Sequence, residues 1–302
     1  MRSDKFVSKK AENLYSNLSS QIDRVHRHNN MGSYKSRERN KNSMQRFAVH
    51  LSNNYGLQSL KNVSNKHIKS YVEEMQGKYA PSTIKCELSG IRMYLDLIGN
   101  KNKIVKNDAL NLERRNNMKD RKWKEKEYEA FRNLCKESGR ERDYMVSTIA
   151  RNTGMRIHEI YRVSKLDARK SLEKMEFSVK GKGGKCRTIY INDEVKSIFE
   201  KRLKEMEEEN NKSDKLFVNE DEKTHLCIKS SQNFLNRNRD KFEERNSENS
   251  ETHITYHGLR HNYANEKYNE YIENGLSSRE AEFLVSELLG HNRSEITRRY
   301  TC

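Results

Sequence analysis

Residues 175–191 read MEFSVKGKGGKCRTIYI, a stretch in which strand-forming residues alternate on both sides of the glycine-rich turn GKGG. The alternation and the turn together predict a β-hairpin. Most apolar residues elsewhere in the chain recur at helical rather than strand spacing. We therefore expect a mainly α-helical protein with one small β-hairpin, and a mixed α/β domain around that hairpin.

The N-terminal third is expected to form a small helical bundle. Its clearest helix is 82–98, where Ile84, Leu88, Ile91, Leu95 and Ile98 step by 4, 3, 4 and 3 residues behind Pro81. Similar apolar spacing predicts helices over 12–25, from 44 to 55 and from 68 to 75. The polar, basic residues 26–40 are expected to form a loop.

The C-terminal part is expected to be helical around the hairpin. Helices are predicted over 125–137, 140–152, 193–206, 257–272 and 278–289, with a weak one near 229–242 and a short strand at 216–218. The charged stretch 100–124 lacks periodicity. These expectations divide the chain into an N-terminal extension (1–30), a helical domain (31–105), a linker (106–124) and a C-terminal domain (125–302).

The charge balance points to a polyanionic partner. The 302 residues include 60 Lys and Arg against 44 Asp and Glu, a net charge of +16. Residues 1–120 hold 23 basic and 11 acidic residues, so most of the excess lies there. Such a bias is typical of nucleic-acid binding, although a solubilising surface is the alternative.

Several protein classes are not expected from the composition. No apolar run approaches the ~20 residues that span a bilayer, and the start MRSDKFVSKK lacks the apolar region of a secretory signal. The five cysteines form no CxxC pair, which argues against a disulfide scaffold or a common zinc site. We therefore expect a cytoplasmic protein with no membrane partner. His26 and His28 are read as solvated rather than metal-binding.

Four short strings in the second half carry candidate chemistry: TGMRIHEI (153–160), KGKGGKCR (180–187), HGLRH (257–261) and LGHNRSEITRRY (289–300). Taken singly, each is weak, because Arg156 could form a surface salt bridge and Lys182 could be a solvated turn lysine. Together they supply reagents for phosphodiester chemistry. Guanidinium groups match a phosphate bidentately, a tyrosine hydroxyl can be a nucleophile, and a lysine can protonate a leaving oxygen.

These strings resemble the motifs of the tyrosine recombinases of the phage integrase and Xer group. The family's T-G-x-R-x-x-E string is matched from Thr153 to Glu159, and its G-K-G-x-K-x-R hairpin from Gly181 to Arg187. Its H-x-L-R-H box is matched from His257 to His261. The L-G-H string ends at His291, and Tyr300 follows nine residues later, at the family's spacing for the nucleophile.

The resemblance implies a SAM-like core-binding domain followed by a catalytic domain, and site-specific DNA recombination or integration through a 3′-phosphotyrosyl intermediate. It assigns the catalytic roles to Arg156, Lys182, His257, Arg260, His291 and Tyr300. Glu159 and His261 are expected to orient these residues. Lys85, Arg92, Lys185 and Arg187 are expected to contact DNA. Spacing alone does not choose between Lys182 and Lys185 as the acid.

The resemblance also implies the partners. These are double-stranded DNA, a homotetramer on two DNA sites and, as a further candidate, an accessory factor that bends DNA or sets direction. No cofactor and no metal are expected, and the gene is expected to come from a bacterium, a phage or another mobile element. The alternatives are an inactive DNA-binding accessory protein of the same fold and a type IB topoisomerase activity.

Two departures from the family affect the expected architecture. The segment from His261 to His291 is longer than in compact members, and only Thr301 and Cys302 follow Tyr300, so we expect no helix beyond the nucleophile. Contact between protomers would then need another element. The apolar stripe of the 12–25 helix is the candidate, although packing on its own bundle is the favoured alternative.

Overall fold

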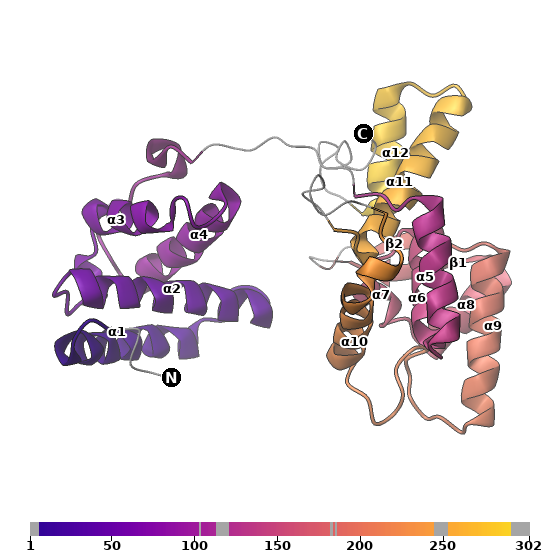
Figure 1. Ribbon diagram of the computed structural model, residues 1–302, viewed down its shortest axis with the longest axis horizontal. Helices are drawn as coiled ribbons and strands as arrows, with labels where there is room; N and C mark the ends of the chain where they lie inside the picture. Colours follow the sequence, from indigo (N-terminus) through magenta and orange to yellow (C-terminus); the bar gives the residue numbers. More distant parts are fainter. Residues whose placement is uncertain are drawn as a thin grey trace. The chain divides into compact units, whose positions relative to one another are not determined.

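The computed structural model describes residues 6–102, 104–112, 121–181, 184, 186–244 and 253–290, and the chain divides into two compact units. Unit 1 comprises Met1–Asn117 and unit 2 comprises Met118–Cys302. Figure 1 shows unit 1 as a helical bundle and unit 2 as helices around a two-stranded hairpin. The expected fold class, mainly α-helical with one small sheet, is confirmed.

The described residues of unit 1 form four helices around one apolar core. They are α1 (Lys9–His28), α2 (Tyr34–Asn54), α3 (Asn65–Met75) and α4 (Pro81–Ile98), with 3-10 turns at Leu60–Asn62 and Asn107–Leu110. Leu18 and Ile22 of α1 are fully buried in the same cluster as the apolar faces of α2 and α4. The stripe of α1 therefore packs on its own bundle, the favoured one of the two alternatives.

Two expectations about unit 1 need correction. Helix α2 begins at Tyr34, within the range expected to be a loop, because Ser33 caps it and its first turns keep their polar side chains largely in solvent. In the range expected to be linker, Leu110 and Leu112 are buried in the core of unit 1. Polar residues can thus extend a helix whose apolar face starts one or more turns later.

Unit 2 contains the remaining elements. Its helices are α5 (Glu125–Glu137), α6 (Glu141–Thr153), α7 (Ile157–Ile160), α8 (Lys165–Lys174), α9 (Asp193–Glu208), α10 (Thr224–Arg237), α11 (Tyr256–Glu273) and α12 (Ser278–Leu289), with a 3-10 turn at Arg239–Lys241. Strands β1 (Glu176–Lys180) and β2 (Cys186–Tyr190) pair antiparallel, which confirms the hairpin. Phe177 faces Ile189 in the register, and both are buried against the core.

The expected strand at 216–218 is wrong. Leu216, Phe217 and Val218 are all buried, but they lie in a turn whose one bridge joins Lys215 to Ser164. A three-residue apolar run is equally compatible with a strand and with a buried turn. Helix α8 was not expected, because only Ala168 and Ser171 of its residues are buried and no apolar stripe marks it.

Candidate active site

The centre of the candidate site is Arg260, which lies on α11 and has no exposed surface. Its Nη1 donates a hydrogen bond to the carbonyl oxygen of Gly154 at 2.5 Å, and its Nη2 donates to the carbonyl of Leu289. One guanidinium thus joins α11 to the turn that precedes Arg156 and to the end of α12. Burying a charged group is costly unless it is hydrogen-bonded, so this arrangement fixes the side chain firmly.

Gly154 has the backbone conformation and the small size that this turn needs. Its φ of +62° lies in the left-handed region, where it ends α6. A Cβ atom at this position would lie 2.4 Å from Cδ1 of Tyr263, a buried residue of α11. The close approach of the Tyr263 ring brings α11 against the α6–α7 turn, and hence Arg260 near Arg156.

Trp123 fixes the start of α11. Its backbone N–H and carbonyl bond the side chain of Asn262 at 2.8 and 2.7 Å, and its Nε1 donates to the carbonyl of Thr255 at 2.8 Å. Gly258, the variable position of the H-x-L-R-H box, allows this contact, since a Cβ there would lie 2.3 Å from the carbonyl oxygen of Arg121. Trp123 lies in the range expected to be linker, so this role was not predicted. The available signal was that Trp123 is the one tryptophan of the chain.

Arg156 stands at the N-terminus of α7 and is paired with Glu159 one turn on. Nη1 of Arg156 lies 2.9 Å from Oε1 of Glu159, and its backbone N–H donates to Oε2 at 2.8 Å. The Arg156 side chain retains 23% of its surface, whereas Glu159 retains 1%. The carboxylate thus fixes the arginine from its buried side and leaves part of the guanidinium facing solvent.

Arg187 lies on the other side of the same carboxylate. Its Nη1 and Nη2 donate to the two oxygens of Glu159 at 3.1 and 2.7 Å, and its side chain is 6% exposed. Burial would raise the pKa of Glu159, but the hydrogen bonds and charges of Arg187, together with Arg156, outweigh burial and hold that pKa at about 2. The guanidinium of Arg187 is thus buried against Glu159, and the DNA contact expected of Arg187 stays a prediction.

His257 lies one turn before Arg260 on α11. Its pKa is lowered to about 4, first because surrounding protein displaces water and then because of the positive charges of Arg260, Arg156 and Arg121. The ring nevertheless keeps solvent contact. It stands edge-on to the ring of His261, with the centroids 5.2 Å apart. His257 is therefore neutral at physiological pH in the DNA-free protein, and it can accept a proton.

Four predicted site residues lie outside the described part of the chain: Lys182, Lys185, His291 and Tyr300. The structure describes the segments that lead to them. Strand β1 ends at Lys180 and β2 begins at Cys186, on either side of the turn that carries the two lysines. Helix α12 ends at Leu289, and Gly290 caps it with a φ of +63° immediately before His291.

The two expected DNA contacts of unit 1 lie on α4 and differ in their surroundings. Arg92 donates from Nη1 to Oδ1 of Asn107 at 2.9 Å and from Nη2 to the carbonyl of Val105 at 2.7 Å. Its guanidinium thus fixes the segment after α4, and a direct DNA contact of Arg92 stays a prediction. Lys85 is half-buried on the same helix, and its DNA contact stays a prediction.

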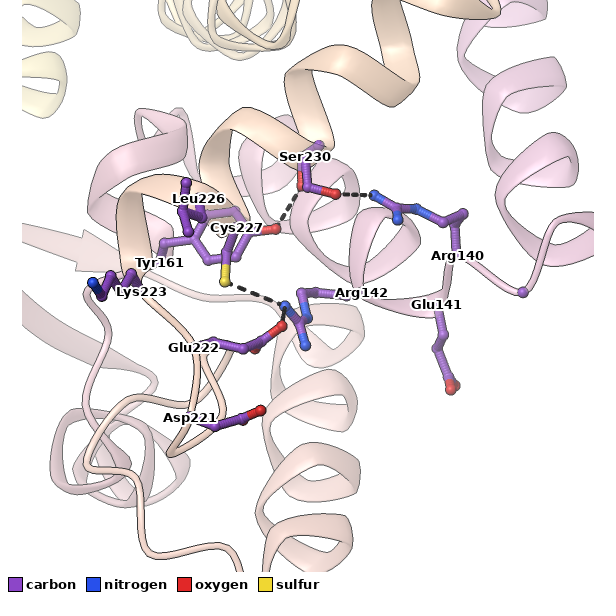
Figure 2. Close-up of a pocket in the computed structure, with 12 residues that line it drawn as sticks. Arg140, Glu141, Arg142, Tyr161, Asp221, Glu222, Lys223, Leu226, Cys227 and Ser230 are labelled. Atoms are coloured by element: carbon purple, nitrogen blue, oxygen red, sulfur yellow. Dashed lines mark hydrogen bonds and ion pairs between the residues drawn. The ribbon is translucent and has the colours of Figure 1, made fainter.

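A separate pocket of about 610 Å³ lies between α10, the start of α6 and the turn at 221–223 (Figure 2). Arg142 crosses it, with Nη1 2.9 Å from Oε1 of Glu222 and 3.5 Å from Sγ of Cys227. Two other lining residues are also paired, with the Tyr161 hydroxyl 2.6 Å from Oγ of Ser231. No predicted site residue lines this pocket, whose paired polar groups join α10 to α6 and to the end of α7.

Neither a metal site nor a membrane span is found in the described part of the chain. No group of three His, Cys, Asp or Glu residues is arranged there to hold a metal ion. None of the helices described has the length and apolarity that crossing a bilayer requires.

Comparison with sequence families finds two matches that together cover most of the chain. Residues 121–302 match the model described as "Phage integrase family", and residues 15–104 match the model described as "Phage integrase, N-terminal". No curated protein matches.

Comparison with solved structures finds the same two-unit fold. A lambda integrase dimer bound to a COC′ core site has a TM-score of 0.68 at 16% identity, with 94% of this chain and 95% of that chain covered. The Tn1549 transposon integrase with transposon right end DNA has a TM-score of 0.67 at 16% identity, with 94% of each chain covered. The XerH recombinase bound to palindromic difH substrate has a TM-score of 0.65 at 21% identity, with 100% of this chain and 87% of that chain covered.

Proposed function

The chain belongs to the phage integrase family of tyrosine-type site-specific recombinases, and on that premise we propose that it cuts and rejoins duplex DNA through a covalent bond from Tyr300 to a 3′ phosphate. The observation that carries the proposal is the arrangement of Arg156, Arg260 and His257. Arg260 of α11 bonds the carbonyl of Gly154, two residues before Arg156 at the start of α7, and His257 lies one turn before Arg260 on the same helix.

The arginines supply the electrostatic part of the mechanism. A phosphodiester under attack becomes a five-coordinate dianion, and preorganised positive donors stabilise this transition state more than the ground state. Arg156 faces solvent in part and is assigned the direct contact with the phosphate. Arg260 is fully buried and is assigned to hold the turn at Gly154 in place while adding its positive charge to the site.

Tyr300 is assigned the nucleophile and Lys182 the acid. The Tyr300 oxygen bonds to phosphorus as the bond from phosphorus to the 5′ oxygen breaks. The tyrosine proton passes to neutral His257, and the leaving 5′ oxygen takes a proton from Lys182. The new phosphotyrosyl ester retains the energy of the phosphodiester, so religation by a 5′ hydroxyl needs no nucleotide cofactor. His291 is assigned a further hydrogen bond to the phosphate.

The proposed partner is double-stranded DNA. The net charge of +16 favours attraction to a polyanion, and the excess in residues 1–120 assigns most of the non-specific affinity to unit 1. We extend the proposal to a homotetramer on two DNA sites, an accessory factor that bends DNA or sets direction, and a cytoplasmic location. Solved structures of similar fold contain DNA, as the lambda integrase and XerH complexes do.

Covalent capture of DNA tests the proposed function. The protein is incubated with nicked duplexes of random sequence, and DNA that stays attached in denaturing detergent is amplified and sequenced. We expect wild-type protein to enrich one sequence class and Tyr300→Phe to bind that duplex without attaching to it. Equal attachment by both proteins, or attachment by neither, would contradict the proposal.

A further inference from the structure

Arg187 belongs to the buried part of the site, although it ends the same sequence string, 180–187, that carries Lys182 in the turn. It is the second residue of β2 and follows the turn that carries Lys182. Its side chain reaches across to α7, where its two terminal nitrogens bond the two oxygens of Glu159. Arg187 is 6% exposed and Glu159 is 1% exposed, so the pair is shielded from water.

The same side chain also contacts the end of α12. Gly290 there has no Cβ, and a Cβ would lie 3.0 Å from Cδ of Arg187 and 3.8 Å from its Nε. Gly290 precedes His291 directly. Arg187 therefore lies where three segments meet: α7 with Arg156, the β-hairpin with Lys182, and the end of α12 with His291.

The charges of this group determine what Arg187 can do. Glu159 carries one negative charge and lies between two arginines, at 2.9 Å from Arg156 and at 2.7 Å from Arg187. The three groups together carry one net positive charge. Without Arg187, the buried carboxylate would be neutralised by Arg156 alone, and the attraction of Arg156 for a phosphate would fall.

We propose that Arg187 is a positioning residue that balances the charge of Glu159, so that Glu159 can fix Arg156 without cancelling the positive charge that Arg156 offers to the scissile phosphate. This inference rests on the proposed function. The division of roles follows from exposure: Arg156 keeps 23% of its side-chain surface and faces the substrate side, whereas Arg187 is buried behind the carboxylate. Both arginines contact one carboxylate, and Arg156 is the more exposed of the two.

The electrostatics of Glu159 provide a readout specific to this role. Its pKa of about 2 reflects burial, which acts upward, outweighed by Arg187 and Arg156. Removing Arg187 removes the strongest of the lowering contacts, so the pKa of Glu159 rises. The other ionisable groups around the pair are His158 of α7, Arg162 just after that helix, and Tyr263 of α11.

The test compares variants on a duplex obtained by covalent capture with the wild-type protein. Arg187→Ala should slow first-strand cleavage by about 10- to 100-fold, the size of effect seen when a group that orients a metal ligand is removed. Arg202→Ala is the matched control. Arg202 is also a mostly buried arginine of unit 2, bonded to Glu205 at 3.1 Å, but it lies outside the site. The Arg202→Ala variant should cleave the duplex at close to the wild-type rate.

Removal of Glu159 distinguishes charge balance from simple packing. If Arg187 serves to balance Glu159, then it becomes dispensable once the carboxylate is gone. Glu159→Gln and Glu159→Gln/Arg187→Ala should therefore cleave at the same rate, and the double variant should be faster than Arg187→Ala. The comparison of the two Gln variants holds even where Arg187→Ala fails to fold.

A pH series provides the second arm. Because loss of Arg187 raises the pKa of Glu159, Glu159 should become protonated at a higher pH in Arg187→Ala than in wild type. The cleavage rate of the variant should therefore recover relative to wild type as pH falls. The double variant lacks the carboxylate and should show no such recovery. Recovery in the double variant would assign the effect to His158 or another group.

Several results would overturn the inference while leaving the proposed function intact. These are wild-type cleavage by Arg187→Ala, a further loss when Arg187→Ala is added to Glu159→Gln, or a flat pH ratio for folded Arg187→Ala. Failure of wild-type protein to capture any duplex would instead contradict the proposed function itself, and this inference with it.

Discussion

Gly154→Ala should destabilise unit 2 through two separable effects. The first is the left-handed backbone at φ +62°, which costs an L-residue with a Cβ about 1–2 kcal/mol. The second is the collision of the new methyl group with Tyr263, whose Cδ1, Cε1 and Cγ would lie 2.4, 3.0 and 3.1 Å away. Overpacking of this kind costs about 1–3 kcal/mol, because a buried ring cannot move aside without displacing its neighbours.

Gly139→Ala is the matched control for the backbone effect. Gly139 has a φ of +63°, but no atom lies within 4 Å of its missing Cβ. It should therefore lose only the backbone contribution of about 1–2 kcal/mol. For a unit of this size, each kcal/mol lowers the melting temperature by about 2–4 °C, so we expect a fall of about 2–8 °C for Gly139→Ala and about 4–20 °C for Gly154→Ala.

The assay can follow unit 2 alone. Trp123 is the only tryptophan of the chain and is buried in unit 2, so its fluorescence on heating reports the unfolding of that unit. The Gly154 carbonyl also accepts a hydrogen bond from Arg260, so Gly154→Ala should slow DNA cleavage more than Gly139→Ala does. Equal melting temperatures for the two variants would refute the packing argument, because the Tyr263 ring would then yield at no cost.

Three further predictions concern the chemistry and the two units. Lys182→Ala should slow cleavage on an ordinary duplex and recover on one with a 5′-phosphorothiolate, which leaves without an acid; rescue of Lys185→Ala instead would reverse the assignment. Residues 118–302 alone should bind DNA more weakly than the full chain and with a smaller salt dependence, measured by fluorescence anisotropy over a salt series; identical curves would contradict the role of unit 1. The pKa of His257 in the folded protein is lowered to about 4, so its contribution to stability is present above about pH 6.5 and is lost as pH falls toward 4. Over that range His257→Gln should lose less free energy of unfolding than wild type, measured by urea unfolding. Parallel plots of unfolding free energy against pH for the two proteins would contradict the lowered pKa.

The sequence predicted those elements whose apolar residues repeat at one clear period. The helix expected over 82–98 is α4 at Pro81–Ile98, and the expected hairpin is β1 with β2. Each has a turn or cap signal beside a periodic apolar face, so local preference and burial agree.

Elements without such a face could not be predicted in the same way. Helix α8 buries only Ala168 and Ser171, and its one strong signal is the cap at Ser164, whose hydroxyl accepts from the backbone N–H of Asp167 at 3.0 Å. The run at 216–218 is held in the core by a contact between segments far apart in sequence, in which the backbone N–H of Leu216 donates to the carbonyl of Val163. Spacing along the chain contains no information on such contacts.

The candidate site shows the same limit for charged residues. The motif strings named Arg156, Glu159, His257 and Arg260, but not which side of the protein each guanidinium faces. Arg187 looks like a DNA contact in the sequence because it is basic and follows a turn. Its partner, Glu159, lies 28 residues earlier, and only the packing of β2 against α7 brings the two together.

Identification of the residue to which DNA becomes attached shows whether Tyr300 is the nucleophile. Wild-type protein is trapped on a captured duplex, the complex is digested with nuclease and protease, and the modified peptide is sequenced by mass spectrometry. We expect a nucleotide joined through its 3′ phosphate to Tyr300, with no other residue modified. A nucleotide on any other side chain, or one joined through a 5′ phosphate, would contradict the assignment of Tyr300.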